Sequence, residues 1–237
     1  HIFNSYINKA NCCNISFIIT RILFKKIMNF NHFKNNIFKL EESPIGGLEA
    51  QFNLAPKLRF RYSEEKINAL RPKKAAVITL FYPNNNDEVC FLLTLRADYN
   101  GTHASQISFP GGKFENNDKT LKNTALRETL EEVGIPVKDI LIFRQMTDVF
   151  IPPSNFLVTP FLGYLTYKPT FTKNHEVEEL ITVSVKDLLD NSSVSTTTLS
   201  TSYAKNIKVP CFVLNNYVVW GATAMMLNEI KDLLKNI

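Results

Sequence analysis

The sequence contains few cysteines, and their arrangement argues against two common ways of stabilising a chain. The four are Cys12, Cys13, Cys90 and Cys211, and they show neither the CxxC spacing nor the histidine clustering of a zinc site. Four cysteines in 237 residues are also too few for a disulfide framework. We therefore expect a protein of a reducing compartment, with a cytoplasmic location.

Long apolar runs and concentrations of one charge are absent as well. No unbroken apolar segment approaches the roughly 20 residues that a membrane-spanning helix needs. The lysines and arginines are scattered, although the formal net charge is +5. A nucleic-acid-binding surface normally gathers such charges into a patch or stripe. We therefore expect neither a membrane nor a nucleic acid as partner, and the excess positive charge mildly favours anionic small molecules.

The composition is that of a globular protein with one large domain and an appendage. Hydrophobic residues make up 45% of the chain and charged residues 21%. Residues 1–27 lack periodicity, a clean apolar region and a small-residue cleavage site, so a signal peptide is not indicated. We interpret them as a non-native or disordered extension before Met28, with a targeting segment as the alternative. Residues 28–71 are expected to form helical pieces and loops, and residues 72–237 the main domain.

Apolar, β-branched runs separated by turn residues predict a sheet in the main domain. The first two runs, on either side of a Pro-Asn-rich turn, are expected to form a hairpin, and so are the last two, around Asn215-Asn216. The Ser/Thr-rich stretch 192–202 is expected to be a loop. Helices are expected over 121–133, from 185 and over 222–237. Strands and helices are mixed without the regular alternation that a doubly wound sheet shows. The predicted strands cover 75–82, 89–95, 106–109, 140–143, 158–166, 179–185, 209–214 and 217–220.

The helix over 121–133 carries the strongest functional signal. Leu121, Ala125, Leu126, Thr129, Leu130 and Val133 fall on one half of a 3.6-residue wheel, which predicts a buried face. Asp118 is expected to be the N-cap, and Gly134 ends the helix.

The opposite face of this helix carries Arg127, Glu128, Glu131 and Glu132. Carboxylates three and four residues apart repel one another and destabilise an isolated helix by a few tenths of a kcal/mol per pair. A divalent cation would reverse the sign of this interaction, and Mg²⁺ prefers such hard oxygen ligands. A Glu-rich face is more often plain solvated surface. Here a Gly-Gly turn after a strand, Gly111-Gly112, leads into the helix and allows a ligand to approach the backbone closely.

The segment from Gly111 to Ile135 resembles the Nudix box, whose form is G-x5-E-x7-R-E-U-x-E-E-x-G-U with U aliphatic. Arg127, Glu128, Glu131, Glu132, Gly134 and Ile135 match it. Thr129 replaces an aliphatic residue, Asp118 occupies the earlier acidic position, and one residue is inserted before Arg127. The resemblance implies a Nudix-type α/β/α sandwich with a mixed β-sheet.

Two further stretches resemble the coenzyme A diphosphatase branch of this family, which shares the inserted residue. Leu92-Leu93-Thr94-Leu95-Arg96-Ala97, followed by Phe109-Pro110-Gly111-Gly112, is similar to that branch's coenzyme A recognition stretch. Gly101 and Ser105 replace its internal Arg and Gly. Trp220-Gly221-Ala222-Thr223-Ala224 is similar to a run near the end of those enzymes.

The resemblance implies roles for the acidic face. Glu128 and Glu132 would bind Mg²⁺ or Mn²⁺ directly, and Glu131 would bind a further ion or its water. Arg127 would orient Glu131, which is the first candidate for the general base. The alternative base lies in the cluster Glu176, Glu178 and Glu179, which is otherwise an acidic loop before a strand.

Other residues are assigned to substrate binding or to structure. The candidate substrate-binding residues are Arg96, Gly111, Gly112 and Ser154, and Gly112 could also offer its carbonyl to the metal. Arg96 could instead form a surface ion pair. His103 is expected to form hydrogen bonds in a loop, and Trp220 to lie in the core.

The function implied is metal-dependent hydrolysis of the diphosphate bond of coenzyme A or its thioesters. The products would be 3′,5′-ADP and 4′-phosphopantetheine or its acyl form. The alternative substrates are other nucleoside diphosphate derivatives, such as ADP-ribose, a dinucleotide or an oxidised nucleotide. A binding module without chemistry is disfavoured because all three box carboxylates are present. The protein is expected to be a monomer or homodimer.

Overall fold

The computed structural model describes residues 29–97, 106–201 and 204–237. The interpretation of residues 1–27 and the expectations for Gly101, His103 and Ser105 lie outside this part of the chain. The α-helices are α2 (Phe30–Asn35), α3 (Ile37–Glu42), α4 (Gly47–Phe52), α5 (Glu64–Ala69), α6 (Leu121–Val133), α7 (Val185–Leu189) and α8 (Gly221–Leu234). The strands are β1 (Lys73–Pro83), β2 (Val89–Arg96), β3 (Ile107–Ser108), β4 (Gly111–Lys113), β5 (Leu141–Gln145), β6 (Val149–Ile151), β7 (Phe156–Tyr164), β8 (Val177–Ser184), β9 (Val194–Thr201), β10 (Ala204–Leu214) and β11 (Tyr217–Trp220).

The described residues form an eight-stranded sheet and a separate three-stranded one. In the large sheet β1 lies at the centre, antiparallel to β2 and β4 and parallel to β7. The β1–β2 hairpin was predicted and is confirmed. Asn84 closes its turn, because its side-chain oxygen accepts hydrogen bonds from the backbone N–H groups of Asn86 and Glu88. Because β1 has both parallel and antiparallel neighbours, the predicted mixed sheet is confirmed as well.

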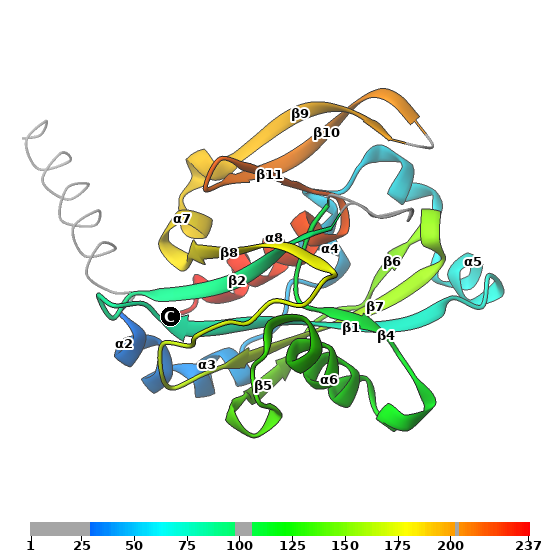
Figure 1. Cartoon of the computed structure of the whole chain (residues 1–237). Helices are drawn as coiled ribbons and strands as arrows, with labels where there is room; N and C mark the ends of the chain where they lie inside the picture. The colour runs from blue at the N-terminus through cyan, green and yellow to red at the C-terminus, as the bar shows by residue number, and fades with distance from the viewer. Residues whose placement is uncertain (1–28, 98–105, 202–203) are drawn as a thin grey trace, which may run out of the picture.

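Helices cover both faces of the large sheet (Figure 1). Helix α6 packs on one face, where Ala125, Leu126 and Val133 join Ile78 and Phe161 in one buried cluster. Helix α8 contributes to a larger cluster on the other face, which also includes β10 and β11 residues. Helices on both faces of the large sheet are what the predicted α/β/α sandwich requires.

The segment before β1 packs onto the domain. Phe33 is fully buried, and its ring centroid lies 5.0 Å from that of Phe81 on β1. Arg144 on β5 donates hydrogen bonds to the carbonyl groups that end α3. Buried Glu229 on α8 accepts hydrogen bonds from the Gly47 N–H and the Gln51 side chain of α4. These contacts hold the N-terminal segment against both the sheet and the closing helix.

The expected loop over 192–202 is wrong. Residues Val194–Thr201 form β9, which pairs with β10. The Ser/Thr run offers no apolar alternation to detect, but threonine is β-branched and fits a pleated strand once a partner is present. The predicted β10–β11 hairpin around Asn215-Asn216 is confirmed, and both turn residues have positive φ.

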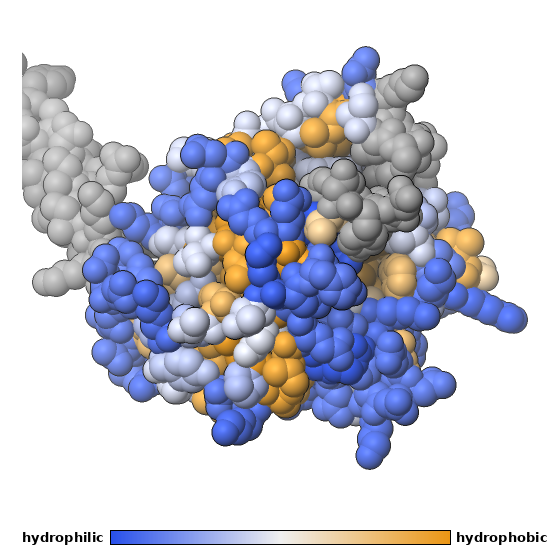
Figure 2. All heavy atoms as spheres, in the orientation of Figure 1, coloured by the Kyte–Doolittle hydropathy of each residue, from blue (hydrophilic) through white to orange (hydrophobic). Residues whose placement is uncertain are grey.

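The outer surface has no large apolar belt on the face drawn in Figure 2. Hydrophilic side chains dominate that face, and apolar residues are gathered in separate patches between them (Figure 2). Among the described helices, none has the length and hydrophobicity needed to span a membrane.

Candidate active site

Helix α6 presents the acidic face, and its ends are fixed by two caps. Thr120 is the N-cap, since its hydroxyl accepts a 3.1 Å hydrogen bond from the Asn123 N–H. The assignment of Asp118 to this position is wrong. Gly134 ends the helix at φ 74°, a left-handed conformation that favours glycine. Leu130 was expected on the buried face but is 45% exposed.

The Thr129 departure from the box is explained by the packing of α6. The side chain is fully buried, and its hydroxyl donates a 2.6 Å hydrogen bond to the Ala125 carbonyl one turn earlier. Because that hydroxyl has a partner, threonine occupies an aliphatic position without leaving a buried polar group unsatisfied.

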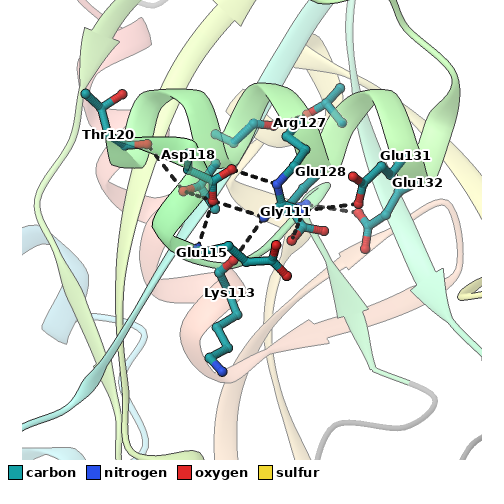
Figure 3. Close-up of polar contacts among 12 residues, drawn as sticks. Gly111, Lys113, Glu115, Asp118, Thr120, Arg127, Glu128, Glu131 and Glu132 are labelled. Atoms are coloured by element: carbon teal, nitrogen blue, oxygen red, sulfur yellow. Dashed lines mark hydrogen bonds and ion pairs between the residues drawn. The ribbon is translucent and has the colours of Figure 1, made fainter.

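Arg127 organises the acidic residues around it (Figure 3). Its Nε lies 2.7 Å from Asp118 Oδ1, and its Nη1 lies 2.9 Å from Glu128 Oε1 and 3.1 Å from Glu131 Oε2. Its Nη2 also donates to the Lys113 carbonyl. The hydrogen bonds from Arg127 hold the pKa of Asp118 well below its usual range. Asp118 therefore fixes the guanidinium that in turn contacts two of the box carboxylates.

Gly111 and Gly112 form strand β4 rather than the expected turn. They pair with Val77 and Ala76 of β1. The Gly111 N–H donates a 2.9 Å hydrogen bond to Glu132 Oε2. A Cβ at Gly112 would lie 2.6 Å from Glu128 Oε2, so the carboxylate occupies the space that any side chain would take. The glycine pair thus lets α6 carboxylates lie directly on the backbone of a sheet strand.

Glu132 and Glu128 carry negative charge in a poorly solvated place. Glu132 is 3% exposed, and burial raises its pKa to about 7 against the opposing effects of the Gly111 hydrogen bond and Arg96. The Arg96 Nη1 atom lies 3.9 Å from Glu132 Oε1. Burial also raises the pKa of Glu128, partly offset by Arg127. Glu176 raises the pKa of both carboxylates, and Glu128 also raises the pKa of Glu132, so the negative charge here is only partly compensated.

The remaining acidic candidates take different positions. The Glu131 side chain is 53% exposed and turned toward Arg127. The cluster Glu176–Glu179 is divided: Glu176 acts electrostatically on both Glu128 and Glu132, whereas Glu179 forms a hydrogen bond with Tyr217. Within that cluster, Glu176 therefore lies near enough to the α6 carboxylates to act on both of them.

A pocket of about 630 Å³ opens beside the glycine pair, within the size range of small-molecule sites. The four predicted substrate-binding residues, Arg96, Gly111, Gly112 and Ser154, all line it. Trp220 also lines it and is half-buried, so its placement in the core is wrong. The pocket brings together strand ends and a helix that are more than 100 residues apart in the sequence.

The comparisons with known proteins identify the family. The NUDIX domain family matches residues 72–199 of the chain. The chain belongs to the Nudix family. The uncharacterized Nudix hydrolases NudL of Yersinia pestis (strain Pestoides F) and of Yersinia pseudotuberculosis serotype O:1b (strain IP 31758) are each 31% identical over 144 residues, which is 60% of this chain and 71% of theirs.

A solved structure supports the same fold. RenU, a Nudix hydrolase from M. smegmatis, superposes with a TM-score of 0.50 at 16% identity, covering 70% of this chain and 88% of RenU. The Nudix domain and its hydrolase relatives make the protein a hydrolase of phosphorus-containing anhydrides.

Nudix hydrolases generally need divalent cations, and the residues of this Nudix domain fit one. The fit rests on Glu132 and Glu128, two under-compensated carboxylates beside the backbone of Gly111 and Gly112. Across the described ranges, no three acidic, His or Cys side chains are gathered closely enough to form a complete cage. Mg²⁺ is commonly held by one or two carboxylates together with waters and substrate phosphates, which matches such a partial set.

Several residues that line the pocket were not predicted from the sequence. Arg59 on the 3₁₀-helix η1 (Lys57–Arg61), Lys73 and Phe150 line it together with the predicted residues. The position of Arg59 depends on how the N-terminal segment packs, and those of Lys73 and Phe150 on the pairing of β1 and β6 in the sheet, which no local pattern reveals.

Proposed function

We propose that this Nudix hydrolase cleaves the diphosphate bond of coenzyme A or its thioesters, giving 3′,5′-ADP and 4′-phosphopantetheine or its acyl form. One observation carries the proposal. The two stretches that resemble the coenzyme A diphosphatase branch lie far apart in sequence, yet Arg96, Phe109 and Gly112 of the first and Trp220 and Thr223 of the second line one pocket. That convergence is expected if both stretches contact the same substrate.

The pocket residues and the adjacent carboxylates of α6 are proposed to have separate roles in substrate binding and hydrolysis. Gly111 and Gly112 line the part of the pocket where the diphosphate would lie, and Arg96 offers it positive charge. Glu128 and Glu132 would hold a divalent cation beside it. When bound, such a cation neutralises charge on phosphate oxygens and lowers the pKa of water. Arg127, held by Asp118, would position Glu128 for this role.

The general base is proposed to be Glu131, with Glu176 as the alternative. If Glu131 serves, Glu176→Gln should lower kcat less than about fivefold, because its effect is only electrostatic. Glu178→Gln is the matched control, since Glu178 is an exposed carboxylate two residues away. Steady-state kinetics of the two variants decide the matter. A loss of 100-fold or more in Glu176→Gln alone would transfer the role to Glu176.

The substrate assignment is tested with a panel of diphosphates under Mg²⁺ and under Mn²⁺. We expect coenzyme A to be turned over fastest, with 3′,5′-ADP identified by mass among the products. Rapid hydrolysis of ADP-ribose or a dinucleotide, with no 3′,5′-ADP released from coenzyme A, would reject the proposal in favour of another nucleoside diphosphate derivative.

A further inference from the structure

Arg59 is a pocket-lining residue with an unmet hydrogen-bond donor. Its Nη1 atom is buried and has no hydrogen-bond partner. The Oγ atom of Ser154, which lines the same pocket, is buried without a partner as well. Buried polar groups are nearly always hydrogen-bonded, and an exception at the wall of a pocket is explained when a bound ligand or ion supplies the missing partner. Two such atoms on one pocket therefore indicate that something polar binds there.

The charge of Arg59 is also uncompensated. Within the described ranges, no acidic side chain forms an ion pair with it. Its guanidinium instead lies over the Phe150 ring, 5.7 Å from the ring centroid. Burial lowers the pKa of Arg59 to about 10, which reflects the cost of a cation held away from water. An anion would relieve that cost and accept the hydrogen bond that Nη1 can donate.

Arg59 lies over Phe150, on a strand of the pocket that is well separated from the glycine strand β4. Phe150 belongs to β6. The strand order from β6 to the glycine strand is β6-β7-β1-β4, and each strand pairs with the next. Three strand spacings separate β6 from β4, or about 14 Å. We call Arg59, Lys73, Phe150, Ser154 and Phe156 the distal wall. Lys73 adds a second cation to it, 5.2 Å from the Phe156 ring centroid. Lys73 lies on β1, next to the glycine strand, whereas a diphosphate beside Gly111 and Gly112 is too short to span the about 14 Å from β4 to the strand of Phe150, over which Arg59 lies.

We propose that the distal wall is a subsite for a phosphate monoester carried by the nucleotide half of the substrate, with Arg59 as its main ligand and Ser154 as a hydrogen-bond donor. Resting on the proposed function, this assigns to the wall the 3′-phosphate of coenzyme A. Arg59 would then be a specificity-determining residue contributed by the N-terminal segment, outside residues 72–199 that match the family. The subsite would favour coenzyme A over dephospho-coenzyme A, which differs only in that phosphate.

Kinetics with these two substrates test the proposal. Arg59→Met should lower kcat/KM for coenzyme A by about 10- to 100-fold, the worth of a lost charge-assisted hydrogen bond. The value for dephospho-coenzyme A should change less than twofold, which also reports that the fold is intact. Lys57→Met is the matched control, because it removes a positive charge from the same 3₁₀-helix at an exposed position that does not line the pocket. An equal loss for both substrates, or no loss for either, would overturn the proposal.

Binding of the nucleotide products separates this inference from the proposed function. Calorimetric titration should show 3′,5′-ADP binding about tenfold or more tightly than 5′-AMP, and Arg59→Met should remove that preference, with Ser154→Ala reducing it. If the wild type fails to cleave coenzyme A but keeps the Arg59-dependent preference, the substrate assignment fails and the subsite stands. Equal affinity for the two nucleotides in the wild type would overturn the subsite whatever the enzyme cleaves.

Discussion

Glu132→Gln is expected to lower kcat by about 100- to 10,000-fold, the range for loss of a well-placed charged catalytic group. The glutamine keeps the length of the side chain, and its amide oxygen can still accept the Gly111 N–H. What disappears is the negative charge that a divalent cation would bind. Steady-state kinetics with saturating Mg²⁺ and calorimetric titration with Mn²⁺ should both show the loss. A kcat within a few-fold of the wild-type value would contradict the assignment of Glu132 to the metal site.

The same substitution is expected to leave the fold at least as stable. Burial raises the pKa of Glu132 to about 7 in the folded protein, above the value of about 4.3 for an unperturbed glutamate. An acid whose folded pKa is raised destabilises the fold when ionised, and this penalty grows as the pH rises through the interval between those values. At pH 8 without divalent cations, Glu132→Gln should therefore have a Tm equal to or above that of the wild type. Glu65→Gln, an exposed change in the first turn of α5, should leave activity unchanged and lower the Tm by a few degrees at most.

Gly112→Ala should mainly lower the activity, whereas Gly111→Ala should mainly lower the stability of the fold. At Gly112 the new Cβ meets the carboxylate end of Glu128, a flexible side chain that can move aside. The fold should tolerate this, but a displacement of about 1 Å in a catalytic group can lower the rate about 100-fold. Gly112→Ala is therefore expected to lose activity while its Tm falls by only a few degrees. A Gly112→Ala enzyme with normal kcat would show that the position of Glu128 does not matter.

At Gly111 the obstacle is backbone. The new Cβ would lie 2.6 Å from the Val77 Cα, and the residue has φ 149°, a conformation that residues with a side chain rarely adopt. Neither the close contact nor the backbone angle can relax without disturbing the β1–β4 pairing. Gly111→Ala should therefore destabilise the fold by about 3 kcal/mol or more. Denaturant unfolding of the two variants side by side measures the contrast, and equal stabilities would contradict it.

Elements defined by local periodicity could be predicted from the sequence. The β1–β2 hairpin, the span of α6 and the shared face of Glu128, Glu131 and Glu132 depend on residues at most a few positions apart along the chain. The spacing of these residues also sufficed for the resemblance to the Nudix box. The limits of local reasoning are visible in the same helix. Leu130 has the periodicity of a core residue but lies beyond the reach of the sheet, and Asp118 has the chemistry of a cap but is recruited by Arg127.

What depends on distant partners was decided only by tertiary structure. The Ser/Thr stretch became β9 because β10 supplies its hydrogen bonds, and the glycine pair became a strand because β1 does. By itself, the amino-acid sequence determined the acidic helix, the hairpins and the class of chemistry, because side chains a turn or a strand apart fix these. The tertiary structure decided that Glu176 lies close enough to act on Glu128 and Glu132 and that Arg59 reaches the pocket, because both positions are set by packing between segments that no short-range pattern connects.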